Sequence, residues 1–552
     1  MLLLPALPII IPLAAAILGV LTWRIKRASF LIALIGSLAH MAAAAALLLE
    51  TLAHGHGVLH VGGWTGPVGI SIVADPFGAT LALMASWSGL AAIIYSRKSV
   101  DAARQHRFYF PLISVLLAGV SGAFLTGDLF NLYVWFEVLL MSSFVLLSLG
   151  GAQRQLQGAF KYVTLNLISS ALFLISAGLI YGYVGTLNMA DLAVRIANAP
   201  ESIHTPLLIV GALLIFAFSI KAALFPLSFW LPASYHTPPL AISGLFAGLL
   251  TKVGVFAILR TTTLIFQGEL WLTNTLLVIA SITMLVGVLG AASQYEFRRV
   301  LVFHSISQVG YMVLGVAIGT PEALAAALLF IVHHNIVKTN LFFITGLVER
   351  VRGSTDLHAT GIRGLYATSP ALSILFLVTS MALAGIPPLS GFVAKLAIIK
   401  AGFEAQAWLP VAAALLTSIV TLYSMIKLWS EGFLRSPERP GQEHHTHHDI
   451  HAPAKVNPYP KLPLSMVAPC VVLTLAAVAI GIFAGPIMLI CNRAGEVAFD
   501  RAAYVKAVLG SESAELLRDA NTINTEQETS SLDVRFSLPA SEPAPSIPEP
   551  TP

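Results

Sequence analysis

Four lysines lie inside long apolar segments, each of which has the length of a membrane-spanning helix. They are Lys221, Lys252, Lys338 and Lys395, and Glu137 has a similar position in another segment. An ionised side chain near the centre of a bilayer costs about 2.5–3.5 kcal/mol. Several such residues in one chain therefore indicate a polar interior, and the chemistry that they predict is the movement of protons between buried groups.

Histidines of interest lie in two apolar segments, one of which also carries Lys338. The stretch IVHHNIVKTNLFF places His334 and Lys338 four residues apart, so both lie on one face of a helix. His333 is turned away from that face by about 100°. Neutral imidazole can both accept and donate a proton near neutral pH, which predicts a relay role for His334, with a structural hydrogen bond as the alternative. His333 and His304, in VLVFHSISQVGYM, are secondary candidates for the same relay.

Glu137 lies in NLYVWFEVLLMSSF and has no charged neighbour within one helical turn. Its partner must come from another helix, and Lys221 is the best candidate. Burial favours the neutral form of an amine, whereas a nearby carboxylate favours the charged form. Movement of the carboxylate would then load and unload the lysine. The alternative is a static ion pair that locks two helices together.

Two of the lysine-bearing segments contain helix breakers. FSIKAALFPLSFWLP has Lys221 followed by Pro226, and LAGIPPLSGFVAKLAIIK has Pro387 followed by Lys395. Proline removes a backbone hydrogen bond, so the freed carbonyl groups must be satisfied by protein or water. Broken helices in corresponding positions of two halves are typical of internal repeats with an ion site at each break. Kinks in packed helices without a function are the plainer alternative.

The whole chain reads as an all-α polytopic membrane protein. It has 552 residues, of which 57% are hydrophobic and 11% charged, against about 25% charged in an average soluble domain. Apolar runs long enough to span about 30 Å predict about fourteen transmembrane helices. They lie near residues 3–22, 28–50, 72–96, 108–126, 129–149, 160–184, 206–234, 239–261, 271–292, 300–319, 322–348, 370–402, 408–430 and 464–490.

Five regions follow from this pattern. Residues 1–104 hold helices 1–3, residues 105–430 hold the ten helices of a proton-translocating core, and residues 464–491 hold a C-terminal helix. A polar loop at 431–463 contains HHTHHDIH, which could bind zinc or copper, but a mobile Pro-rich loop without cysteines is more typical of a solvated linker. Residues 492–552 are expected to form an extramembrane tail, partly disordered, with a surface helix near its start.

The positions of the basic residues and of the cysteines predict the orientation of the chain in the membrane and the kinds of site that it lacks. Basic residues gather in alternate loops, with Arg195, Arg260 and Lys400 as the main exceptions, so the positive-inside rule places both termini on the non-cytoplasmic side. Cys470 and Cys491 are too far apart along one helix to form a disulfide. No metal site, cofactor or nucleic-acid partner is predicted, and membrane lipids surround the chain.

The order of these motifs resembles the antiporter-like subunits shared by respiratory complex I and the Mrp-type multisubunit cation/proton antiporters. The matching stretches are VWFEVLLMSSF, FSIKAALFPLSFWLPASYHTPP, LLTKVGVF, HNIVK and GIPPLSGFVAK. The resemblance implies fourteen helices with two inverted five-helix repeats. It also implies that Glu137 and Lys221 are a coupled pair, that Lys252 and the His334–Lys338 face connect the halves, and that Lys395 is the terminal proton site.

Within this group, VGGWTGPVGISIVADPFGA and FHSISQVGYM look like the D-type subunits of the Mrp antiporters, whereas complex I relatives commonly have histidine where this chain has Gln308. That branch implies a transporter subunit, not an enzyme, in the bacterial inner membrane. It would exchange protons for Na⁺, or for K⁺ or Li⁺, together with the A, B, C, E, F and G subunits and without a redox cofactor. The alternatives are a proton-pumping subunit of an NADH:quinone oxidoreductase and a non-conducting assembly scaffold.

Overall fold

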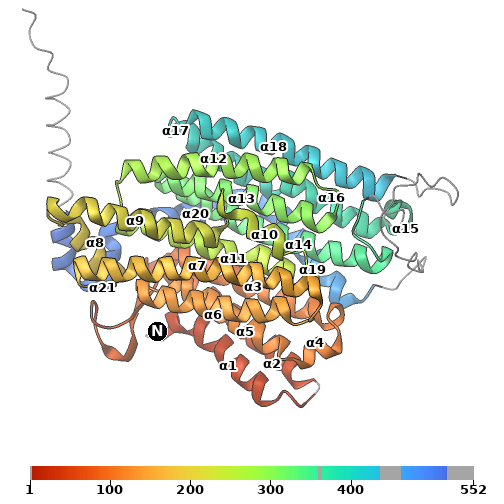
Figure 1. The fold of residues 1–552 in the computed structure, drawn as a ribbon, viewed down its shortest axis with the longest axis horizontal. Helices are drawn as coiled ribbons and strands as arrows, with labels where there is room; N and C mark the ends of the chain where they lie inside the picture. The colour runs from red at the N-terminus through yellow and green to blue at the C-terminus, as the bar shows by residue number, and fades with distance from the viewer. Residues whose placement is uncertain (1–2, 26, 358–362, 436–461, 519–552) are drawn as a thin grey trace, which may run out of the picture.

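The structure, a computed structural model, describes residues 3–25, 27–357, 363–435 and 462–518. Almost all of these residues are helical, in one bundle of long helices (Figure 1). The helices are α1 (Leu7–Leu21), α2 (Ala28–His54), α3 (Pro76–Ser99), α4 (Ala102–His106), α5 (Tyr109–Leu125), α6 (Leu129–Ser148), α7 (Gln153–Val184), α8 (Met189–Ala197), α9 (Glu201–Ala222), α10 (Trp230–Ser234), α11 (Leu240–Arg260), α12 (Leu270–Ala292), α13 (Phe297–Ile318), α14 (Pro321–Arg352), α15 (Leu365–Thr368), α16 (Pro370–Ala384), α17 (Ser390–Glu404), α18 (Trp408–Trp429), α19 (Leu464–Ile482), α20 (Ala484–Phe499) and α21 (Arg501–Leu509).

The predicted class, a polytopic all-α membrane protein, is confirmed. Among the described residues, 12 helical stretches are long and apolar enough to cross a membrane, and two shorter apolar helices, α5 and α16, join them. These stretches together agree with the expected number of about fourteen. The protein is therefore a multi-pass membrane protein.

Three helices form the centre of the bundle. Every residue of α11 is buried, and α13 and α14 are buried along nearly their whole length. Burial on all sides shows that α11, α13 and α14 are surrounded by other helices, whereas α2, α7, α12 and α18 leave one side uncovered for lipid. Polar groups on α11, α13 and α14 therefore lie in the interior of the protein.

Both predicted breaks are present. The apolar run at 206–234 divides into α9 and α10, with the short 3₁₀ turn Leu227–Phe229 between them. The run at 370–402 divides into α16 and α17 around Pro387. The run at 464–490 also divides, into α19 and α20, and α20 continues to Phe499. Apolar length alone does not distinguish one long helix from two helices joined by a tight turn.

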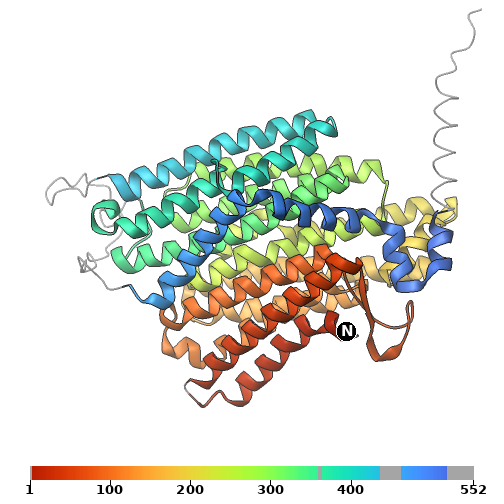
Figure 2. The same ribbon diagram turned by 180° about the vertical axis from the view of Figure 1, so that it is seen from behind.

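A small hairpin and the ends of the described chain lie at one end of the bundle. Strand β1 (Gly57–His60) pairs antiparallel with β2 (Ser71–Ala74), so the helix expected to start at residue 72 starts instead at Pro76. Figure 2 shows α19 and α20 crossing the face of the bundle that is hidden in Figure 1, with α21 at the same end as α8. The opposite end carries α4 and α15 (Figure 1). The described N-terminal and C-terminal residues thus share one end.

Several basic residues expected in loops lie in helices. Arg195 is within α8, and Arg260 is a buried residue at the end of α11. Cys470 and Cys491 are both free and buried, in line with the predicted lack of a disulfide between them. The His-rich stretch at 444–451 and the Pro-rich end of the chain lie outside the described residues.

Candidate functional site

The predicted relay residues lie on five helices that pack in the bundle interior. Lys252 on α11 and both His334 and Lys338 on α14 have no exposed surface, and Lys221 on α9 and Lys395 on α17 are 5% and 4% exposed. Glu137 on α6 differs because it is only half-buried. The residues around each lysine are mostly apolar, so each amine bonds to the few carbonyl and hydroxyl groups of its own helix or of neighbouring helices.

The first break holds Lys221 against α7. Helix α9 ends one residue after the lysine, where Ala223 adopts a left-handed conformation with φ of 62°. The Lys221 Nζ donates to Ser170 Oγ at 2.8 Å and to the Asn166 carbonyl at 3.4 Å. The freed carbonyl of Ile220 accepts a hydrogen bond from Trp230 Nε1 at 2.9 Å. The break therefore satisfies its own backbone groups while presenting the amine to the interior.

Glu137 and Lys221 interact electrostatically but do not form an ion pair among the described residues. The amine bonds to Ser170 instead and lies 5.0 Å from the centre of the Phe136 ring. Glu137 Oε1 is buried without a hydrogen-bond partner in the described part of the chain. The carboxylate and the amine are thus close enough to interact electrostatically but are not hydrogen-bonded to each other.

Helix α11 approaches the first break closely and carries Lys252. A Cβ on Gly254 would lie 2.5 Å from the backbone nitrogen of Ala222, so only glycine permits this contact. The Lys252 Nζ donates to the Ala247 carbonyl of its own helix and to Thr251 Oγ1 at 3.3 Å. Lys252 therefore lies two residues from the contact between α11 and the end of α9.

His334 lies between two lysines in the centre of the bundle. It interacts electrostatically with Lys252, Lys338, His333 and His304. Neither of its ring nitrogens has a hydrogen-bond partner among the described residues, whereas Lys338 Nζ donates to the Leu301 carbonyl on α13 at 2.7 Å. A buried imidazole with both nitrogens free is costly unless water bonds to it, so this position suits a proton-transfer group.

The second break brings Lys395 to the end of α16. Its Nζ donates to the carbonyl of Ala384, the last residue of that helix, at 2.9 Å. Gly385 follows with φ of 93°, and a Cβ there would lie 2.9 Å from Lys395 Cδ. The partial negative charge of a helix C-terminus favours a cation. The break thus provides a site for the charged amine.

The two secondary histidines connect the centre to this break. His333 Nδ1 and Ser390 Oγ, on the first residue of α17, are 2.8 Å apart. His304 is fully buried in α13, and its Nε2 and Ser424 Oγ on α18 are 2.9 Å apart. It interacts electrostatically with Lys338 and Lys395. Both histidines therefore lie near enough to Lys395 to interact with it electrostatically.

Sequence reasoning missed a buried ion pair at the α8 end. Arg260 Nη2 lies 2.6 Å from Asp75 Oδ2, and both side chains are buried. Asp75 also caps α3 by accepting a hydrogen bond from the Gly78 amide at 2.7 Å. The Arg260 guanidinium lies between the rings of Phe256 and Tyr504, at 5.0 and 5.3 Å. An arginine at the end of an apolar run was the available signal.

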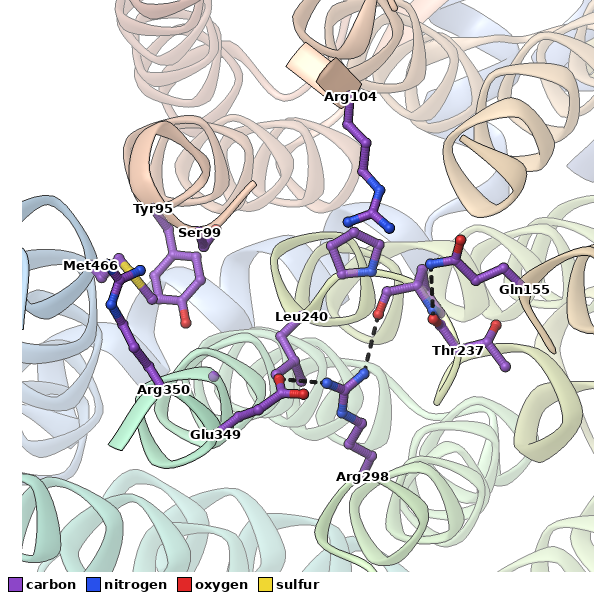
Figure 3. A pocket seen from close by; sticks show the side chains of 13 residues that line it. Tyr95, Ser99, Arg104, Gln155, Thr237, Leu240, Arg298, Glu349, Arg350 and Met466 are labelled. Carbon is purple, nitrogen blue, oxygen red and sulfur yellow. Dashed lines mark hydrogen bonds and ion pairs between the residues drawn. The ribbon is translucent and has the colours of Figure 1, made fainter. Parts of the chain in front are cut away.

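A cavity of about 350 Å³ opens at the α4 end. Figure 3 shows Arg298 between Glu349 and the loop before α11, and its Nη2 lies 2.5 Å from Glu349 Oε2. Gln155 donates to the Thr237 carbonyl at 3.2 Å, and its Oε1 has no partner in the described chain. A buried free acceptor beside a polar cavity is a position where water binds. Tyr95 lines the cavity on the side of α3 and α14.

The described residues contain no cluster of three or more His, Cys, Asp or Glu side chains that could hold a metal ion. The polar groups around Lys252, His334, Lys338 and Lys395 are instead amines, imidazoles, hydroxyls and backbone carbonyls. This set includes amines and imidazoles, which are groups that can accept and donate protons. It lacks the concentrated negative charge that a tightly held divalent cation needs.

Comparisons with known proteins agree with this arrangement. The family model described as NADH:quinone oxidoreductase/Mrp antiporter, TM, matches residues 126–421. A protein of Alkalihalophilus pseudofirmus, named as the D subunit of a Na(+)/H(+) antiporter, is 42% identical over 464 residues, which cover 84% of this chain and 90% of that relative. A Bacillus subtilis protein of the same name is 37% identical over 91% of this chain and 98% of the relative.

A solved structure extends the likeness to the fold. A chain in the structure of the Mrp complex from Dietzia sp. DQ12-45-1b superposes with a TM-score of 0.84 at 33% identity, covering 92% of this chain and all of that chain. The family match spans both helix breaks and every predicted relay residue. This chain therefore belongs to the NADH:quinone oxidoreductase/Mrp antiporter family of membrane proteins.

Proposed function

We propose that this chain is the proton-translocating D-type subunit of a multisubunit Na⁺/H⁺ antiporter. The single observation that carries the proposal is the buried His334, whose free ring nitrogens lie among lysines that continue toward two helix breaks. The names of the relatives and the Mrp complex structure support the antiporter assignment. In this proposal the chain is a secondary transporter, with no enzymatic reaction of its own.

The proton route runs through the bundle from one break to the other. Protons pass from the Glu137–Lys221 pair to Lys252, across His334 to Lys338, and then to Lys395. His304 and His333 serve beside the last step. Each transfer needs water between neighbouring groups, because direct hydrogen bonds join these side chains to helix carbonyls and hydroxyls and not to one another.

The energetic cost of the lysines favours a function over a scaffold. Four amines at about 2.5–3.5 kcal/mol each amount to about 10–14 kcal/mol. That sum is as large as the whole stability of a typical domain, about 5–15 kcal/mol. A scaffold could join the same helices with apolar residues at lower cost, whereas proton movement requires groups that change their charge.

The α4 end is the cytoplasmic end in this proposal, and the cavity at Arg298 and Glu349 is its aqueous mouth. Most basic loop residues gather at this end, which supports the orientation by the positive-inside rule. Both termini would then face away from the cytoplasm in a bacterial inner membrane. The partners are the A, B, C, E, F and G subunits of the Mrp complex, and the proton-motive force supplies about 2.3 kcal/mol per charge per 100 mV.

A pair of lysine substitutions tests the proposal. The complete complex is assayed in everted vesicles for Na⁺-dependent proton movement, with Lys338→Met compared with Lys427→Met. Lys427 lies at a helix end, where it donates to the Ala292 and Gln294 carbonyls outside the relay. Lys338→Met is expected to abolish exchange with normal assembly, while Lys427→Met retains it. Full exchange by Lys338→Met would instead support the scaffold.

A further inference from the structure

Asn335, the residue after His334, joins three helices in the interior. Its Nδ2 donates to the Gly248 carbonyl on α11 at 2.8 Å, and its Oδ1 accepts from Ser88 Oγ on α3 at 2.5 Å. A carbonyl oxygen can only accept, so the orientation of the amide is determined and Ser88 must be the donor. Ser88 and Asn335 have no exposed surface. Both hydrogen bonds therefore lie in the protein interior, away from bulk solvent.

This contact belongs to a close antiparallel packing of α14 on α11. One turn farther along α14, Thr339 Oγ1 donates to the Gly244 carbonyl at 3.2 Å. A Cβ on Gly248 would lie 2.5 Å from Thr339 Oγ1 and 3.0 Å from Asn335 Nδ2. Small residues let helix backbones approach in this way, and polar side chains then bond across the contact. A slip of one turn, about 5.4 Å, would break both bonds.

The same contact determines where His334 lies relative to Lys252. Gly248 is one helical turn before Lys252, and Asn335 is the next residue after His334. The imidazole has no hydrogen bond of its own among the described residues, so the placement of the α14 backbone sets its position. We propose that Asn335, held by Ser88, is a positioning residue that keeps His334 at the separation from Lys252 across which a proton passes. This inference depends on the proposed relay.

Asn340 provides a matched comparison on the same helix. It is also fully buried, and its Nδ2 donates two hydrogen bonds, to Thr379 Oγ1 at 3.0 Å and to Thr474 Oγ1 at 2.8 Å. These partners lie on α16 and α19, not on α11. Substitution by aspartate at either position replaces one amide nitrogen by oxygen and removes buried hydrogen bonds. Only the change at Asn335 acts on the contact with α11.

The experiment measures Na⁺-dependent proton exchange by the complete complex in everted vesicles as a function of pH. Asn335→Asp is expected to lower the maximal rate at least about tenfold, the factor that corresponds to about 1.4 kcal/mol. It should also move the optimum upward by about one pH unit, because a carboxylate favours the protonated forms of nearby groups. The groups that face His334 are Lys252 on α11, Lys338 and His333 on α14, and His304 on α13.

Asn340→Asp should reduce the amount of assembled complex about as much as Asn335→Asp does, but it should keep the pH profile of the parent. Should Asn335→Asp fail to assemble, Ser88→Ala removes only the bond that holds the amide, and a rate about fivefold lower is expected for one lost hydrogen bond. A parental profile and rate in either variant would overturn the positioning role. His334→Ala tests the relay separately from the positioning role of Asn335. Full exchange in that variant would overturn the proposed relay itself. If exchange is lost in His334→Ala, the result with Asn335→Asp decides the positioning role.

Discussion

The Asp75–Arg260 ion pair allows one prediction to be worked out in full. The pair joins the start of α3 to the end of α11, the helix that carries Lys252. Asp75→Asn removes the negative charge but keeps a good N-cap, since asparagine caps helices as well as aspartate does. The substitution therefore isolates the ion pair from the cap, and it leaves the Arg260 guanidinium buried between two aromatic rings.

The expected loss of stability is large. Removing one partner of a buried ion pair costs about 3–5 kcal/mol, because the other charge stays buried without compensation. The rings of Phe256 and Tyr504 already contact the guanidinium in the parent, so they do not compensate for the change. At about 2 °C per kcal/mol for a large chain, the Tm should fall by about 6–10 °C.

Thermal unfolding of the purified complex in detergent, followed by size-exclusion chromatography of the heated sample, measures this change. The double variant Asp75→Asn with Arg260→Leu is the control, since it removes both charges and should recover most of the lost Tm. A Tm within about 1–2 °C of the parent for Asp75→Asn alone, which corresponds to less than about 1 kcal/mol, would refute the reasoning that the pair fastens α11.

Three further outcomes are expected. Gly385→Ala should lower proton exchange about tenfold or more, because φ of 93° strains alanine and the new methyl group would displace Lys395; exchange in vesicles measures it. Ser390→Ala should lower the exchange rate about fivefold or more, because it leaves His333 Nδ1 without its hydrogen bond. His56 lies outside the membrane spans, and burial lowers its pKa from the usual value of 6.5. The folded chain therefore binds fewer protons at this residue than the unfolded chain does, so the complex should become less stable as the pH falls below about 6.5. His56→Leu should flatten the dependence of Tm on pH between about 7.5 and 5.5.

A control variant and a contradicting result can be named for these outcomes. Gly178→Ala on α7, where a Cβ would meet nothing within 4 Å, should exchange at the parental rate. Parental exchange in Gly385→Ala would show that Lys395 tolerates displacement. An unchanged rate in Ser390→Ala would contradict a role for the His333 bond, and a pH dependence of Tm that persists in His56→Leu would assign it to other groups.

Much of the fold follows from local sequence. Apolar length predicted the spans, and Pro226 and Pro387 predicted the two breaks, because chain length against bilayer thickness and the missing amide of proline act within a single segment. The lysines and histidines of the predicted relay were recognisable for the same reason, since a charge inside an apolar run is conspicuous without knowledge of its neighbours.

Features that depend on neighbouring helices could not be predicted. Ser88 and Asn335 are 247 residues apart, and neither is unusual in its own segment. Arg260 was placed in a loop because it lies at the edge of an apolar run, and its partner Asp75 is 185 residues away. The separated arrangement of Glu137 and Lys221 likewise depends on Ser170 of α7, which provides an alternative partner for the amine.

The bond between Lys395 and the Ala384 carbonyl couples the charge of one residue to the geometry of the polypeptide around it. An ammonium donates a hydrogen bond roughly twice as strong as that of a neutral amine, and it also balances the partial charge at the end of α16. Loss of the proton therefore weakens the link between α16 and α17. By thermodynamic reciprocity, any mechanical pull from an adjoining subunit that separates these two half-helices must make that proton easier to release.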